Sequence, residues 1–226
     1  MNRTKLAIAA LGLALISNPA SAFFIDSVND SLGFSWNYSG GGYNLTGVGT
    51  MTATALSSNS LTLQISLTNN TVAASNNNAR LTAFGFGINP NATGVTFSDG
   101  NDAGMVGASL SAIPSLKEIE VCAFGGVNCP GGSNGGVFAN GASDTFSLIL
   151  TGAAGAFTNG VTIEPLGYKY QTNVGSFEFS CSTGSNGQYC GGGSVSVPEP
   201  GSLALLGGLA VAAYATSRRR RSSLNT

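Results

Sequence analysis

The sequence contains no histidine and little charge. Of its 226 residues, 8% are Asp, Glu, Lys or Arg. Without histidine the chain has no Ser-His-Asp or Cys-His system of the kind that activates the nucleophile in many hydrolases. Its polar surface must come mainly from Ser, Thr, Asn and backbone amides, which is unusual for a cytosolic enzyme. We therefore expect a protein that is not an enzyme and binds no cofactor.

Basic residues are scarce between the two ends of the chain. Residues 23–197 contain three of them, Arg80, Lys117 and Lys169, against nine acidic residues, which is a net charge of −6. A surface with that balance repels the phosphates of nucleic acids. We expect no nucleic-acid partner.

The central part also lacks apolar residues at helical spacing over more than two turns. Alternating patterns and frequent turn signals predict strands instead. In residues 61–68 (LTLQISLT) the apolar side chains share one face, and residues 81–88 are apolar or glycine on both faces, which is typical of an inner strand. Further alternating runs are Leu32-Phe34-Trp36-Tyr38, Met51-Ala53-Ala55, Phe146-Leu148-Leu150, Leu166-Tyr168-Tyr170 and Phe177-Phe179-Cys181. The predicted fold is all-β, a single jelly-roll-like β-sandwich at residues 23–195.

Residues 1–22 have the organisation of a secretory signal peptide. Two basic residues precede an apolar run over residues 6–16, and Ala20-Ser21-Ala22 follows as a small-residue cleavage site. The run is too short to span a hydrocarbon core of about 30 Å comfortably. We expect a signal helix, export through the Sec translocon, and signal peptidase cleavage between Ala22 and Phe23. An uncleaved N-terminal anchor is the alternative.

The C-terminal tail, residues 196–226, carries a second set of signals. Pro198-Glu199-Pro200 precedes an apolar stretch at residues 201–216 and the basic run Arg218-Arg219-Arg220-Arg221. Arginines beside a membrane-spanning helix stay on the cytoplasmic side, so the preceding domain is outside. The apolar stretch is short for a permanent span, which favours a transient transmembrane helix. The two prolines keep the chain around Glu199 extended, as a protease requires.

This order of motifs resembles the PEP-CTERM sorting signal. Pro198, Glu199 and Pro200 match its tripeptide, residues 203–214 its transmembrane part, and the four arginines its basic end. The resemblance implies recognition by an exosortase, a membrane protease-transpeptidase of Gram-negative bacteria that also make extracellular polysaccharide. It implies an intermediate anchored in the inner membrane and then a cell-surface or extracellular protein. A plain C-terminal membrane anchor is the alternative.

Four cysteines, Cys122, Cys129, Cys181 and Cys190, lie in the exported part. An oxidising destination favours two disulfides. Of the three pairings we favour Cys122 with Cys129 and Cys181 with Cys190, because each ties a strand end to its own glycine-rich loop. The other pairings stay open. The cysteines within each pair are further apart in the sequence than the closely spaced cysteine pairs of a Cys₄ zinc site.

Three segments, Arg80–Phe86, Ile119–Gly126 and Gly175–Phe179, together with Cys129 and Cys181, resemble the cistern subgroup of PEP-CTERM proteins. That resemblance implies one cysteine-containing β-domain and assigns it no enzymatic activity.

Two pairs of acidic residues are candidates for chemistry. Glu118 and Glu120 are expected on one face of a strand, about 7 Å apart, which fits a glycosidase loosely. Asp99 and Asp102 flank a Gly-Asn turn and could offer oxygen atoms to calcium. Both pairs also have an ordinary explanation, as solvent-facing charges and as a turn that needs no ion.

Aromatic side chains are the stronger candidates for sugar binding, because sugar rings stack on aromatic faces. Trp36, Tyr168 and Tyr170 have the spacing of core residues in strands. Tyr43 and Tyr189 are expected in loops and are the candidate glycan contacts.

The sequence therefore predicts an exported, exosortase-sorted protein with a non-enzymatic structural role at the cell surface or in the matrix, associated with exopolysaccharide or biofilm. A glycan-binding module on the same scaffold is the alternative, and a glycosidase is a distant third.

Overall fold

The computed structural model describes residues 22–40, 42–73, 78–100, 104–130 and 135–182. These residues form strands and loops and contain no helix. Accordingly, none of them belongs to a helix long and apolar enough to cross a membrane. The predicted signal helix and the predicted transmembrane helix at residues 201–216 lie outside the described residues.

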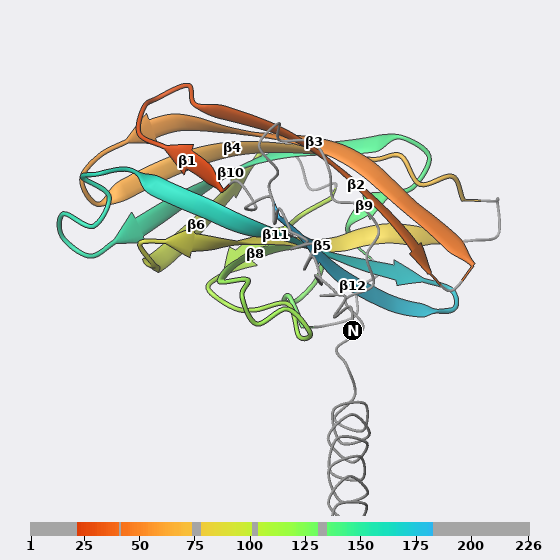
Figure 1. The fold of residues 1–226 in the computed structure, drawn as a ribbon. Helices are drawn as coiled ribbons and strands as arrows, with labels where there is room; N and C mark the ends of the chain where they lie inside the picture. The colour runs from red at the N-terminus through yellow and green to blue at the C-terminus, as the bar shows by residue number, and fades with distance from the viewer. Residues whose placement is uncertain (1–21, 41, 74–77, 101–103, 131–134, 183–226) are drawn as a thin grey trace, which may run out of the picture.

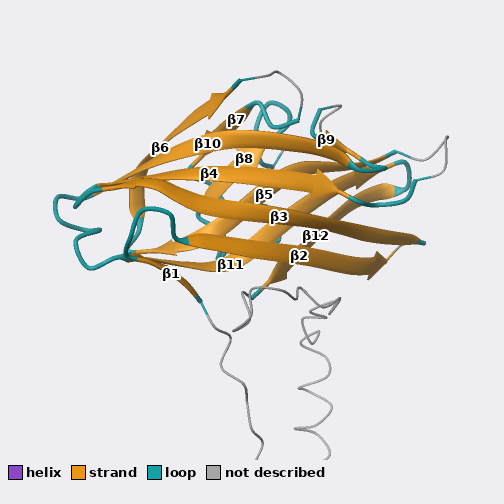
Figure 2. Ribbon diagram, turned by 90° about the horizontal axis from the view of Figure 1, so that it is seen from above, coloured by secondary structure: helices purple, strands orange, loops and turns teal. Residues whose placement is uncertain are grey.

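Two antiparallel sheets pack face to face (Figure 1). The five-stranded sheet has the order β2 (Ser31–Gly40), β3 (Tyr43–Leu56), β4 (Ser60–Asn69), β10 (Ala142–Gly152) and β6 (Ala92–Asp99). The seven-stranded sheet has the order β1 (Phe23–Ile25), β11 (Val161–Thr172), β5 (Ala79–Asn89), β8 (Val121–Phe124) and β7 (Gly107–Ser109). In the same sheet, β12 (Gly175–Cys181) pairs with β11, and β9 (Val137–Phe138) pairs with β5. Figure 2 shows the first sheet lying across the second. The predicted all-β sandwich is confirmed.

The strands follow the alternation of the sequence. In β4, Leu61, Leu63, Ile65 and Leu67 are fully buried, whereas the Thr, Gln and Ser between them reach the outer face. β5 is buried along nearly its whole length on both faces, as expected for an inner strand. The alternating runs thus supply the core of the sandwich.

Aromatic rings from both sheets fill the middle of this core. The Trp36 ring of β2 lies 4.7 Å from the Tyr168 ring of β11, and Phe34 stacks on Phe84 of β5 at 5.5 Å. The indole N–H of Trp36 donates a hydrogen bond of 2.8 Å to the Tyr170 hydroxyl. Burial raises the pKa of both tyrosines, so their hydroxyls stay protonated at neutral pH. The predicted core positions of Trp36, Tyr168 and Tyr170 are confirmed.

Glycines of β3 make room for two of these rings. Gly47 pairs with Trp36, and Gly49 pairs with Phe34. A Cβ atom added at Gly47 would lie 2.0 Å from Trp36 Cζ2 and 2.5 Å from the carbonyl oxygen of Thr68. The indole ring therefore occupies space that any other residue at position 47 would need.

A buried asparagine joins the two sheets at the end of β4. The Asn69 amide nitrogen donates to the carbonyl oxygens of Ala79 (3.0 Å) and Val137 (2.9 Å). Its amide oxygen accepts from the Thr71 backbone N–H (3.2 Å) and from the Tyr170 hydroxyl (3.1 Å). Asn69 thus satisfies four groups that water cannot reach, since the residue is fully buried.

A second, smaller apolar cluster covers the outer side of the seven-stranded sheet. It contains Ile113, Leu116 and Ile119 from the segment before β8, together with Ala83, Cys122 and Cys129. Gly85 and Gly167 leave room for Ile119, whose side-chain atoms would lie within 2.5 to 2.7 Å of an added Cβ. This layer explains why β5 is apolar on both faces.

Two details differ from the predictions. Ala55, expected on the inner face with Met51 and Ala53, is exposed, because the pairing of β3 with β4 shifts by one residue between Ala53 and Ala55. Such a bulge turns the following side chains to the other face. In addition, β2, β3 and β4 form a meander within one sheet, so the topology departs from a jelly roll there.

Candidate functional site

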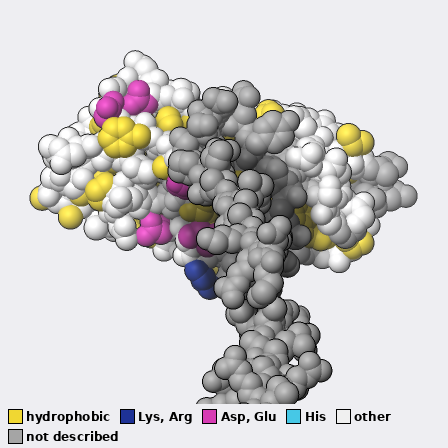
Figure 3. Space-filling view, in the orientation of Figure 1, with side chains coloured by type: hydrophobic (Ala, Val, Ile, Leu, Met, Phe, Trp, Pro, Cys, Tyr) yellow, Lys and Arg dark blue, Asp and Glu magenta, His cyan; other side chains and the backbone are white. Residues whose placement is uncertain are grey.

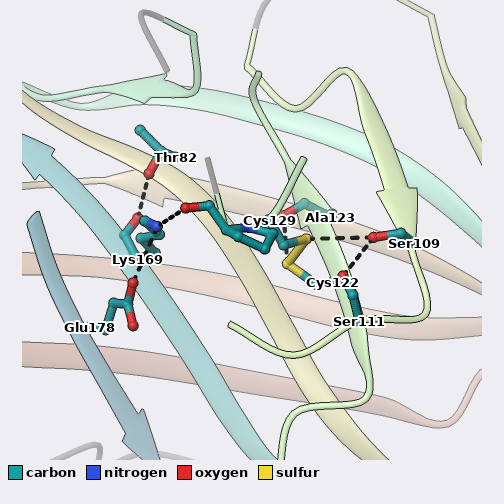
Figure 4. The surroundings of a disulfide bond; sticks show 9 residues. Thr82, Ser109, Ser111, Cys122, Ala123, Cys129, Lys169 and Glu178 are labelled. Carbon is teal, nitrogen blue, oxygen red and sulfur yellow. Dashed lines mark hydrogen bonds and ion pairs between the residues drawn. A yellow bond between two sulfur atoms is a disulfide. The ribbon is translucent and has the colours of Figure 1, made fainter. Parts of the chain in front are cut away.

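The best-defined cluster of reactive groups surrounds a disulfide on the outer side of the seven-stranded sheet (Figure 4). Cys122 of β8 is bonded to Cys129, which confirms one of the two predicted pairs. Both sulfur-bearing residues are fully buried. The bond closes the loop between residues 122 and 129 against the sheet, which lowers the entropy that this loop has in the unfolded chain.

The only ion pair among the described residues lies beside this loop. Lys169 Nζ of β11 lies 3.2 Å from Glu178 Oε1 of β12 and donates to the carbonyl oxygen of Pro130 at 2.7 Å. Glu178 Oε2 accepts the backbone N–H of Ser115 at 2.8 Å. Burial raises the pKa of Glu178, but the hydrogen bonds from Ser115 and Lys169 outweigh it and hold the pKa below its usual value. The ion pair thus attaches two covering segments to the sheet. One contains Ser115 and the other contains Pro130.

Cys181 is also in the disulfide-bonded state. It ends β12, with its side chain buried against the main core. Cys190, its predicted partner, lies outside the described residues, so that pairing stays a prediction.

Glu118 and Glu120 do not form the expected pair on a strand. Both precede β8, and Glu118 lies in an exposed turn. Glu120 Oε2 accepts the backbone N–H of Ile88 at 3.0 Å, and the Glu120 N–H donates to the carbonyl oxygen of Phe86. Glu120 is therefore bonded to β5 directly before β8 begins its pairing with that strand, and the strand geometry assumed for a catalytic pair is wrong.

Tyr43 does not lie in a loop as predicted. It is the first residue of β3 and is half-buried, with its ring 6.2 Å from Phe177. Its hydroxyl donates a hydrogen bond to the side-chain oxygen of Asn173. The ring lies in the strand because β2 continues to Gly40, which leaves a tight hairpin. Tyr189, the other candidate glycan contact, lies outside the described residues.

A pair of carboxylates that the sequence analysis did not join lies at one end of the five-stranded sheet. Asp99 ends β6, and Asp144 lies on the neighbouring strand β10. Burial raises the pKa of Asp144 more than its hydrogen bond from the Met105 N–H lowers it, and the charge of Asp99 raises it further. Asp102, the predicted calcium ligand beside Asp99, lies outside the described residues. Among those described, no three Asp, Glu or Cys side chains gather as a metal-binding group.

The sorting tail also lies outside the described residues, and its sequence identifies it. Residues 196–221 match the family model of the PEP-CTERM protein-sorting motif. The chain carries a PEP-CTERM sorting signal. No curated protein and no solved structure matches the chain.

The PEP-CTERM motif covers every residue that the sequence analysis assigned to sorting, from Pro198, Glu199 and Pro200 to Arg218, Arg219, Arg220 and Arg221. It implies an exported protein that is anchored transiently in the membrane and processed by an exosortase. The match begins after the β-domain and covers none of it, and the cistern subgroup is not confirmed.

The β-domain that precedes the PEP-CTERM motif has one face without acidic or basic side chains. On the five strands β2, β3, β4, β10 and β6 the only such residues, Asp99 and Asp144, lie on the inner face. The outer face carries hydroxyl groups that bond across strands, as in the pairs Ser31–Thr52, Ser143–Thr68 and Thr145–Ser66. Figure 3, which shows the domain from the side, shows acidic side chains and a basic side chain that reach the surface there.

Sequence reasoning missed Asp144, Asn69 and the ion pair of Lys169 with Glu178. A signal existed for Asp144, which continues the inward series of Phe146, Leu148 and Leu150 in β10 and thus places an acid at a core position. No comparable signal marks the ion pair, because it depends on the pairing of β11 with β12.

Proposed function

We propose that this protein is an exosortase-sorted component of the cell surface or extracellular matrix of a Gram-negative bacterium, with the β-sandwich as its non-enzymatic passenger. The match of residues 196–221 to the PEP-CTERM motif carries this proposal. It accounts for export and for the membrane-anchored intermediate. Final release to the surface or the medium follows from cleavage of the tail.

Two observations support a passenger without enzymatic activity. The chain has no histidine. Several carboxylates hold backbone amides in place: Glu120 accepts from Ile88, Glu178 from Ser115, and Asp30 from Asp26 and Ser27. Carboxylates engaged in this way stabilise loops and strand edges and are poorly placed for proton transfer to a substrate.

The sorting step makes a direct prediction about the C-terminus of the mature protein. In a host with an active exosortase, mass spectrometry of the surface or secreted protein should show a chain that ends near Pro198 to Pro200 and lacks Arg218 to Arg221. Deletion of the exosortase, or replacement of Pro198-Glu199-Pro200 by alanines, should leave the arginine-bearing chain in the inner membrane. The exposed substitution Lys117→Ala serves as a control and should be processed normally. Recovery of intact, arginine-bearing protein from the outer surface contradicts the proposal.

A glycan-binding passenger is the second candidate, and the uncharged outer face of the five-stranded sheet favours it. Hydroxyl groups in cross-strand pairs offer donors and acceptors to a neutral polysaccharide, and no charge has to lose its hydration on contact. This face replaces Tyr43 as the candidate surface, because the Tyr43 hydroxyl is bonded to Asn173.

The two candidates differ in one measurement. If the passenger binds glycan, the exopolysaccharide of the producing strain should retain the mature protein, and Gln64→Lys, at an exposed position of β4, should weaken retention about tenfold. Val174→Lys, in the exposed turn between β11 and β12, should leave retention unchanged. If the passenger is structural and binds no glycan, neither the unmodified protein nor any variant is retained. If Val174→Lys alone reduces retention, the glycan contact lies outside the five-stranded sheet's outer face.

A further inference from the structure

β2 is the outermost strand of the five-stranded sheet (Figure 2). β3 pairs with one side of it over its whole length, whereas no described strand pairs with its other side. With ten residues it is also longer than any other edge strand of the two described sheets. An edge strand of this kind presents a row of backbone groups to which a further strand can bond.

Alternate residues of β2 turn their backbone groups towards this open side. The carbonyl oxygen of Asp30 accepts from the Ala53 N–H at 2.9 Å, which sets the bonding pattern at the start of the pairing with β3. Bonded and non-bonded pairs alternate along an antiparallel ladder, so the even-numbered residues of β2 bond to β3. Thr46, opposite Asn37, supports this pattern, because its N–H and C=O both bond to the Thr71 hydroxyl, on the side away from β2. The odd-numbered residues of β2 therefore direct their N–H and C=O groups to the open side.

The other edges of the two sheets carry features that discourage pairing between molecules. β1 and β7 have three residues each, and β12 carries the carboxylate of Glu178. β6, the opposite edge of the five-stranded sheet, lies against β7 of the other sheet. β2 is long and contains no charged residue and no proline, so it has none of these protections.

The sequence of β2 is complementary to itself. Apolar and polar residues alternate, and the inner face carries Leu32, Phe34, Trp36 and Tyr38. When two copies run antiparallel and bond through their open sides, odd-numbered residues lie opposite odd-numbered ones and even opposite even. Apolar side chains then meet on the inner face, and hydroxyl and amide groups meet on the outer face. Such pairing brings no two like charges of β2 together.

We propose that two copies of this chain associate through antiparallel pairing of their β2 strands. The arrangement has two-fold symmetry, so each copy offers the same surface to the other. The two five-stranded sheets then form one continuous sheet. Because Leu32, Phe34 and Trp36 are already buried within each copy, backbone hydrogen bonds supply most of the attraction. We therefore expect a weak dimer, with a dissociation constant of about 10 to 100 µM.

Sedimentation velocity of the full chain in detergent tests this pairing. The unmodified chain should change from monomer to dimer between about 1 and 300 µM. Asn37→Pro should stay monomeric over the same range, because proline removes an N–H from the open side and leaves the bonds to β3 in place. The fluorescence of Trp36, the single tryptophan, reports whether the variant is folded. If it is not, Gly33→Pro gives the same test at a position where a Cβ atom meets no neighbour.

Val28→Pro is the matched control. Val28 is exposed and is the second residue of the turn closed by the bond from the Asp30 N–H to the Ser27 carbonyl oxygen, where proline is favoured. This variant should dimerise like the unmodified chain. All the variants have the same terminal segments, so association through those segments would not distinguish them. A dimer that persists in Asn37→Pro, or an unmodified chain that stays monomeric up to 300 µM, overturns the proposal.

Hydrogen exchange locates the contact. In the dimer the outward N–H groups of β2, such as those of Gly33, Asn37 and Ser39, are bonded to the second copy. Peptides from residues 31–40 should therefore exchange at least about threefold more slowly at 300 µM than at 1 µM. Peptides from β6 should exchange equally at both concentrations. Slower exchange elsewhere in the domain without a change at residues 31–40 would mean that the copies meet through another surface, and would refute pairing through β2.

Discussion

Replacing Asn69 with alanine should lower the free energy of unfolding by about 3 to 5 kcal/mol. The substitution leaves two carbonyl oxygens and one backbone N–H without their partner in a fully buried place, and it removes the acceptor of the Tyr170 hydroxyl proton. Each buried polar group that loses its partner costs about 1 to 3 kcal/mol, and the costs are not additive because the neighbours relax. Urea unfolding followed by Trp36 fluorescence and circular dichroism measures the change.

Asn37→Ala is the matched control for this experiment. Asn37 is exposed on β2, so its loss should change the free energy of unfolding by no more than about 0.5 kcal/mol. A decrease below about 1 kcal/mol for Asn69→Ala would mean that the network is not what joins the two sheets at this end.

The second large effect is expected at Gly47. Alanine there places a methyl group on the Trp36 ring and against the Thr68 carbonyl, so either the indole ring or the strand must move. Overpacking of this kind costs about 1 to 3 kcal/mol, and we expect the upper end because one of the two obstacles is backbone. The emission maximum of Trp36 should also shift if the ring is displaced, which adds a second readout to the urea experiment.

Gly33 offers a control on the neighbouring strand. A Cβ atom at Gly33 meets no atom within 4 Å, so alanine there should be neutral or stabilise the domain by up to about 1 kcal/mol through a less flexible unfolded chain. If Gly33→Ala and Gly47→Ala have equal effects, the close approach of the ring is not the cause.

The sequence predicted those parts of the fold that depend on side-chain alternation. Strands with one apolar face, such as β4 and β10, and the doubly buried β5 were predicted with the correct faces. Alternation says nothing about which strands pair, so the meander of β2, β3 and β4 was not predicted. The bulge that exposes Ala55 has no marker in an Ala-Thr-Ala sequence.

For the candidate sites too, the sequence predicted features that depend on residues close in the chain and missed those that depend on strand pairing. The sorting tail is a linear motif, and its recognition required no structure. The pairing of Cys122 with Cys129 was also predicted, because both residues lie close in sequence around one loop. Asp99 and Asp144 are far apart in the chain and meet only through the register of β6 and β10. Tyr43 was misplaced because a Gly-rich run was interpreted as a loop where the strands of a hairpin continue.

The outer face of the five-stranded sheet has one property that matters wherever this protein resides. Its Ser, Thr, Asn and Gln side chains do not ionise, so this face has no titration of its own and attracts no cloud of counterions. Its hydrogen-bonding pattern is therefore the same in dilute fresh water as in brine, and the same at mildly acidic as at mildly alkaline pH. An exported protein with such a face keeps this part of its surface chemically constant when the salt concentration or the pH around it changes.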